Sequence, residues 1–190
     1  MTLRSSLLTF SSIIVLLFSA APPPRQVRDH LTPTEVDLVK EAQELDKRTE
    51  VFIKAIDRRL MAINGTTVDT STKQAKKEAE IWGEMPTGTR AELVGDIARI
   101  FDEAITNIDD VSTRDEKSPL ISKSLRRLAQ EVNIVMGQLS TVKDKVTNET
   151  EIASFELLNE DAKSILAAAN KLPPEAVEKK GKSKGDKQKN

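Results

Sequence analysis

The chain has no cysteine and no tyrosine, and its 190 residues include one tryptophan and one histidine. Without cysteine it forms no disulfide, has no thiol chemistry and carries no lipid anchor on an N-terminal cysteine. Metal sites need three or more convergent ligands, so the lone His30 does not predict one, and we expect it to lie solvated before the first helix. Helical di-metal and haem centres need histidine on the helices, so we predict no metal and no cofactor.

Acidic residues are common but form no catalytic pattern. We place them on the polar faces of the predicted helices, beside lysine and arginine. They are Glu41, Glu44, Asp102, Glu103, Glu131, Glu160 and Asp161. Acid–base catalysis needs a buried carboxyl group with a shifted pKa, and no acid interrupts an apolar stripe in our reading. We therefore expect solvated faces and no enzyme.

Aromatic residues are also scarce, so the core is expected to be aliphatic. Trp82 lies alone in the irregular connection 65–88. We expect it to pin this connection onto the helices, and the alternative is an aromatic contact at a partner-binding groove. The arginine pairs Arg58-Arg59 and Arg126-Arg127 could each grip an anionic group, although arginines beside an apolar stripe more often drape over the edge of the core.

Residues 1–21 have the pattern of a secretory signal. A single arginine precedes the apolar run Leu7–Phe18, and three small residues follow it. The run is shorter than the roughly 20 residues that a transmembrane helix needs. We predict an exported protein, periplasmic or extracellular. Because Pro22-Pro23-Pro24 is expected to hinder cleavage, the alternative is a form tethered by the uncleaved segment, with residues 22–31 as a Pro-rich linker.

Apolar residues at alternating steps of three and four predict amphipathic helices. The long ones are predicted at residues 33–63, 90–111, 119–146 and 149–170, and residues 73–82 can form a short one. Thr32 with Glu35 gives a capping box at the first start, and Asn64-Gly65 is a typical helix end. A single helix across Thr147-Asn148, with a shift of phase, is the alternative for the last two.

This pattern predicts an all-α, antiparallel up-down bundle of about four helices over residues 32–172. If the first two long helices are antiparallel, Phe52 and Phe101 lie at similar depth. Residues 119–146 keep a 4-3 apolar spacing over nearly four heptads, which is typical of a bundle or coiled-coil seam. Self-association through this helix is therefore a second hypothesis.

Residues 173–190 predict a disordered, lysine-rich tail. The whole chain carries −1, residues 1–21 carry +1 and the tail carries +3, which leaves −5 on residues 22–172. A nucleic-acid-binding core would show a basic face, so we expect no specific nucleic-acid partner. The tail, with Lys179 and Lys180, could contact anionic surfaces weakly, and the alternative is a solubilising end.

Two tripeptides, Asn64-Gly65-Thr66 and Asn148-Glu149-Thr150, match the acceptor for N-glycosylation. In a chain rich in serine and threonine such matches arise by chance. Both asparagines also sit at predicted helix ends, so we interpret the motifs as coincidence.

The leading hypothesis is an exported, non-enzymatic helical domain, structural or interacting, that packs a helix face against an unknown protein partner. Its candidate contact residues are Trp82, Arg126, Arg127, Lys179 and Lys180. The alternatives are an exported chaperone and a carrier with an apolar cavity. Leu31–Glu35 (LTPTE) is similar to the opening of Spy-type periplasmic chaperones over five residues, which implies the chaperone. The rest of the chain does not share the basic, methionine-rich cradle of that family.

Overall fold

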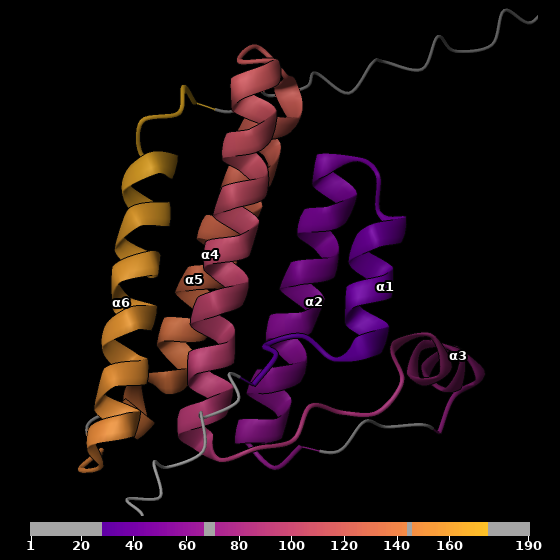
Figure 1. Cartoon of the computed structure of the whole chain (residues 1–190), viewed down its shortest axis with the longest axis vertical. Coiled ribbons are helices and arrows are strands. Elements are labelled where there is room, and N and C mark those ends of the chain that lie inside the picture. The colour runs from indigo at the N-terminus through magenta and orange to yellow at the C-terminus, as the bar shows by residue number, and fades with distance from the viewer. Residues whose placement is uncertain (1–27, 67–70, 144–145, 175–190) are drawn as a thin grey trace, which may run out of the picture.

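The computed structural model describes residues 28–66, 71–143 and 146–174. These residues form six helices and no strand, so the predicted all-α class is confirmed (Figure 1). The helices are α1 (Pro33–Glu41), α2 (Leu45–Ile63), α3 (Lys73–Trp82), α4 (Arg90–Arg114), α5 (Pro119–Lys143) and α6 (Glu149–Ala169). None of these helices is both long and apolar enough to cross a membrane. The predicted signal 1–21 and nearly all of the tail lie outside the described residues.

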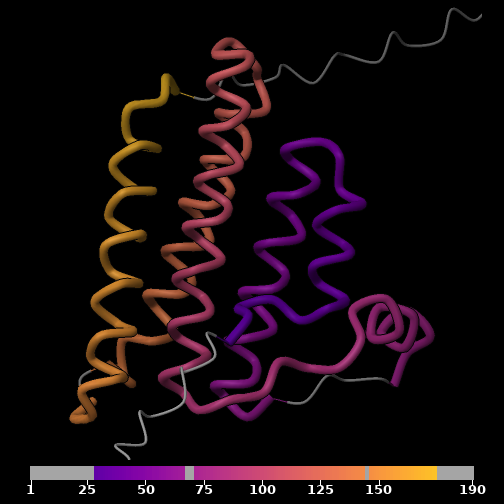
Figure 2. Tube along the Cα trace, viewed as in Figure 1, coloured from indigo at the N-terminus to yellow at the C-terminus, as the bar shows by residue number. Residues whose placement is uncertain are grey.

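The four longest helices pack side by side, and α1 and α3 lie along one flank of this group (Figures 1 and 2). Arg48 of α2 donates to Asn107 of α4 at 2.7 Å, so these two helices run antiparallel. Lys123 of α5 contacts Asp46 of α2 at 2.5 Å, near the start of both helices, so these two run parallel. The long helices α2, α4 and α5 therefore alternate in direction along the chain. The neighbours α2 and α5 are nevertheless parallel.

Helix α4 is the centre of the fold. It packs extensively on α2 and α6, and makes fewer contacts with α5, its successor in the chain. Six consecutive residues, Leu93–Ala98, are buried, because α4 is covered on several sides at this level. The core is mainly aliphatic, with Phe52, Phe101 and Phe155 buried in it. An amphipathic pattern with a single apolar face predicts fewer buried residues than such a helix contains.

The prediction of one continuous helix over residues 33–63 is wrong, because α1 ends at Glu41 and α2 begins at Leu45. The chain leaves the helix at Ala42, whose ψ is 91°, and α1 folds back beside α2. Arg48 Nε donates to the carbonyl of Ala42 at 3.0 Å and so stabilises the turn. In a continuous helix, residues 35 and 59 would be about 36 Å apart. The turn instead brings Glu35 into direct contact with Arg59, at 2.7 Å.

The predicted helix starts are confirmed. Thr32 and Thr89 each form a capping box at the first turn of α1 and α4. Asn148 accepts from the N–H groups of Thr150 and Glu151, so α6 begins anew and the single-helix alternative is wrong. Gly65 adopts a φ of 65° after α2, which only glycine does readily. Because the short helix α3 and the separate α1 add to the long ones, the predicted count of about four helices is too low.

The apolar seam of α5 is used within the chain. Leu128, Val132, Val135 and Leu139 are all at most 1% exposed. These side chains belong to the shared core, so they are not available for pairing with a second copy. Ile134, on another face of α5, is exposed, and self-association through this helix stays a prediction.

Candidate functional site

The most densely charged part of the interior is a cluster of Glu35, Arg58 and Arg59, which we call the arginine node. Arg59 donates two parallel hydrogen bonds to the carboxylate of Glu35, at 2.9 and 2.7 Å. Arg58 lies 3.2 Å from the same carboxylate. Glu35 is fully buried and the two arginines are at most 3% exposed. The sequence suggested arginines that drape over the edge of the core, and this interpretation is wrong for Arg58 and Arg59.

Other N–H groups of Arg58 and Arg59 donate hydrogen bonds to main-chain carbonyls next to the helices. Arg59 donates to the carbonyl of His30 at 2.5 Å, before α1. Arg58 donates to the carbonyls of Trp82 and Gly83, at 2.6 and 3.2 Å, and also to that of Glu84. The node therefore fixes two segments that are distant in the sequence, residues 28–34 and residues 82–87.

The segment before α1 is attached to α4 by a further ion pair and by a contact of the histidine ring. Arg28 donates to Asp96 at 2.9 Å, and His30 Nε2 lies 2.7 Å from Glu103. Leu31 is buried in the core between these contacts and the node. The predicted solvated position of His30 is therefore wrong, and the described end of the predicted linker 22–31 packs on the bundle.

Burial shifts the pKa values of charged groups around these contacts. The pKa of Asp96 is raised because burial disfavours its charge, although Arg28, Arg99 and Arg59 oppose this shift. The pKa of Arg58 is lowered by burial, while the charge of Glu35 opposes the shift. In both groups burial is the largest cause of the pKa shift, and the ionic partners oppose it.

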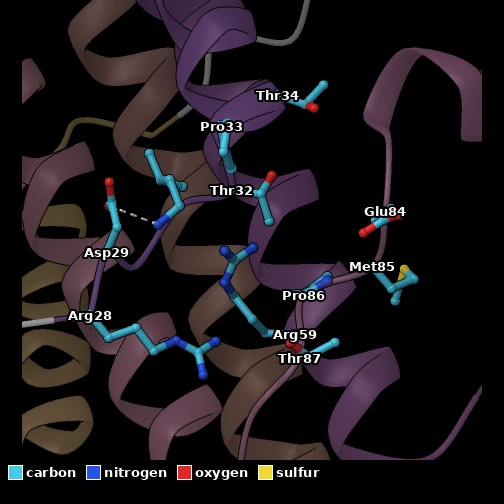
Figure 3. Close-up of a pocket in the computed structure, with 11 residues that line it drawn as sticks. Arg28, Asp29, Thr32, Pro33, Thr34, Arg59, Glu84, Met85, Pro86 and Thr87 are labelled. Carbon is cyan, nitrogen blue, oxygen red and sulfur yellow. Dashed lines mark hydrogen bonds between the residues drawn. The ribbon is translucent and has the colours of Figure 1, made fainter.

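An open pocket of about 640 Å³ lies between the two fixed segments (Figure 3). It is lined by Arg59, by residues 84–87 and by all of residues 28–34 except His30. The lining combines the apolar side chains of Leu31 and Pro86 with threonine hydroxyl groups. Its size is in the range of ligand pockets, roughly 300–1,000 Å³. Figure 3 shows Arg59 at the centre, between Asp29 on one side and Glu84 on the other.

The two cations of the pocket already have carboxylate partners, whereas its two acids have no arginine or lysine partner among the described residues. Arg28 is paired with Asp96, and Arg59 is paired with Glu35. Asp29 is 72% exposed, and its nearest described basic group is the His30 ring, whose Nδ1 lies 3.8 Å away. Glu84 is exposed and forms no ion pair with any described residue. The charge that the pocket offers to a ligand is therefore negative.

Trp82 closes the neighbouring space between α2 and α3. Its ring lies 5.6 Å from the guanidinium carbon of Arg58, in a cation–π contact. A second pocket of about 130 Å³ is formed there, and Met85 lines both this pocket and the larger one. The contact with Arg58 joins α3 and its connection to α2, as expected for a residue that pins the connection.

The other candidate contact residues lie elsewhere. Arg126 of α5 donates to the carbonyl of Pro173, and Arg127 is exposed on the same helix. Neither lines the pockets beside Trp82. Lys179 and Lys180 lie outside the described residues. The structure thus does not bring the sequence-predicted candidates together at one site.

Glu131 and Asp161 are less exposed than the sequence suggested, and their pKa values are raised. Glu131 on α5 is 5% exposed, and burial together with the charge of Asp57 raises its pKa to about 7. Burial and the charge of Asp102 raise the pKa of Asp161, on α6, to about 6. The expectation that these acids lie on solvated faces is wrong for Glu131, and Asp161 is half-buried. No group of three or more potential metal ligands occurs among the residues that the structure describes.

Sequence analysis missed Arg28 and Asp96, and it saw Glu35 only as a capping residue. Asp96 had a visible signal, because it is an acid within the otherwise apolar run Leu93–Ala98. Arg28 had none, since it precedes the first helix in a polar segment. No protein-family model, no curated protein and no solved structure matches the chain.

Proposed function

We propose that the chain is an exported, non-enzymatic helical domain that binds a protein partner at the pocket between residues 28–34 and 84–87. The observation that carries this proposal is the arginine node beneath the pocket. Its buried charges position two irregular segments, and these segments form the pocket walls. Support for export is the signal pattern of residues 1–21.

Burying two arginines and a glutamate is an unusual way to stabilise a small bundle. Buried ion pairs are often no more stabilising than apolar side chains of similar size, because desolvation opposes the attraction. Here the guanidinium groups also satisfy three carbonyls outside the helices, those of His30, Gly83 and Glu84, and the carbonyl of Trp82 at the end of α3. Rigid loops on a helical scaffold are a common basis for binding sites. The position of the node therefore favours a shaped surface over a purely structural role.

The alternatives find less support. A carrier needs an apolar cavity, whereas the larger pocket is open and has charged groups on its rim. A chaperone needs a broad apolar surface, but the most exposed large apolar residues are dispersed over three helices. They are Ile81 on α3, Ile134 on α5, and Ile152 and Leu157 on α6. Exposed apolar residues that occur singly are normal on soluble proteins.

Site-specific photocrosslinking tests the proposed function. A photoreactive amino acid replaces Thr87, at the pocket, or Thr113, near the other end of α4, and the full chain is expressed in its native host. Both threonines are exposed. We expect a discrete protein adduct from position 87 that is absent from position 113. Equal adduct patterns, or no adduct at position 87, would contradict binding at the pocket. N-terminal sequencing of the exported form tests export and cleavage separately.

A further inference from the structure

The segment Met85-Pro86-Thr87 lies outside the helices and forms no turn or bend, as expected of extended backbone. Met85 precedes proline, which restricts it to extended conformations. In an extended segment, the N–H and C=O groups of residues i and i+2 point to the same side. Met85 and Thr87 therefore share one edge, and the missing N–H of Pro86 belongs to the other. The buried ring of Pro86 anchors the segment.

That edge is unoccupied within the described residues. The carbonyls just before it, of Trp82, Gly83 and Glu84, all accept from Arg58. By contrast, no main-chain group of Met85 or Thr87 bonds another described residue. Both residues line the larger pocket. Their N–H and C=O groups therefore remain available to a ligand that supplies complementary main-chain groups.

The charges of the pocket restrict what this ligand carries. Arg28 and Arg59 are already engaged by the carboxylates of Asp96 and Glu35, which weakens their attraction for an anionic ligand. Asp29 and Glu84 are exposed carboxylates on opposite sides of the pocket (Figure 3). Electrostatic complementarity across an interface selects the partner and raises the rate of association. A ligand with lysine or arginine side chains is therefore favoured.

We propose that this pocket binds a basic, extended peptide segment of a partner protein. The main chain of the peptide pairs with Met85 and Thr87, and its cationic side chains face Asp29 and Glu84. This inference rests on the proposed function and names the class of partner. Strand addition of this kind uses main-chain hydrogen bonds for affinity and flanking side chains for specificity.

The decisive variant removes one main-chain donor. Thr87→Pro deletes the N–H group, and since this group bonds no described residue, the change is expected to leave the fold intact. Thr87→Val is the matched variant, because it removes the hydroxyl group but keeps the N–H. The probe is a phage-displayed random dodecapeptide library that is panned against the full chain. Synthetic peptides of the enriched sequences are then titrated, with the fluorescence of Trp82, the only tryptophan, as the signal.

We expect enriched peptides rich in lysine or arginine, with affinity reduced about tenfold or more by Thr87→Pro and clearly less by Thr87→Val. A tenfold loss corresponds to about 1.4 kcal/mol. Equal binding to the wild type and Thr87→Pro would overturn the proposal, as would the recovery of no peptide or only of acidic or uncharged peptides.

A second pair of variants keeps the test informative if Thr87→Pro does not fold. Asp29→Asn combined with Glu84→Gln removes both charges while keeping the size of the side chains. We expect a several-fold loss of affinity that shrinks at high salt. Asp109→Asn with Glu116→Gln, two exposed acids near the other end of α4, is the control and should bind normally. An equal loss in both pairs would contradict a local charge effect. If crosslinking from position 87 persists but no peptide binds, the proposed function stands and this inference alone is overturned.

Discussion

The arginine node and the acids of the helix interfaces show two ways in which one small fold accommodates buried charge. In the node, a buried carboxylate meets two guanidinium groups, and the spare donors reach main-chain carbonyls. At the α2–α5 and α4–α6 interfaces, a carboxyl group instead faces another acid. Oxygen atoms of Glu131 and Asp161 are buried without a partner among the described residues.

This difference indicates that burial by itself does not identify a functional charge. The cost of burying the node is offset by opposite charges in a fixed geometry, so the node positions the backbone around it. At the interfaces, burial and a neighbouring acid raise the pKa of the carboxyl group, and uptake of a proton then reduces the cost of burying it. We therefore expect the node to control local structure, and the interface acids to make stability depend on pH.

Removing the acid of the node should have the largest effect. Glu35→Ala leaves Arg58 and Arg59 buried without their counter-charge, which is expected to lower the free energy of unfolding by about 3–5 kcal/mol. Chemical denaturation at pH 7 measures the change. Glu41→Ala, at the exposed end of the same helix, is the control and should have little effect. A loss below about 1 kcal/mol for Glu35→Ala would show that the node is not essential to stability.

The interface acids should instead make the free energy of unfolding depend on pH. The pKa of Glu131 rises from 4.5 to about 7 on folding, so the folded state binds its proton more tightly. Its contribution to stability is full below pH 4.5 and is lost as the pH rises to about 7, an effect of about 3 kcal/mol. Denaturation from pH 4.5 to 7.5 should show this fall, and Glu131→Gln should flatten it. An unchanged slope in the variant would contradict the assignment.

Trp82→Ala tests whether the tryptophan belongs to the node or to a partner. Loss of its contact with Arg58 and of its partly buried ring should lower the free energy of unfolding by about 1–2 kcal/mol. Ile81→Ala, at the adjacent and more exposed position, should cost less than about 0.5 kcal/mol. Equal stability of the two variants would favour the interpretation of Trp82 as a contact for a partner.

The smallest effect on stability is expected at an exposed apolar side chain of α6. Leu157 on α6 is 42% exposed. Leu157→Gln should therefore change the free energy of unfolding by no more than about 0.5 kcal/mol. A marked loss of stability, or of binding to the peptides selected at the pocket, would show that the outer face of α6 takes part in a function that we place elsewhere.

Much of the local structure could be predicted from the sequence. The capping boxes at Thr32 and Thr89 placed two helix starts, because these signals depend on residues three positions apart. The 4-3 spacing of α5 identified its buried face for the same reason. The turn at Ala42 could not be found in this way, since the contacts that favour it join residues 24 positions apart in the sequence.

The candidate site was even less accessible to sequence analysis. Arg58-Arg59 and Trp82 were recognised as unusual, but their common function depends on the backbone of residues 28–34 and 82–87, which meet only in the fold. Glu131 was assigned to a solvated face because it lies one position from the apolar stripe of α5, and its burial depends on how α2 packs there.

The sequence by itself therefore determined the helical class, most helix ends and the aliphatic core, because periodicity and capping act within a few residues. Only the tertiary structure decided where α1 folds back, which acids are buried and which charges neutralise one another. These properties depend on contacts between distant segments and on the loss of water around them, and the pattern of residues along the chain records neither.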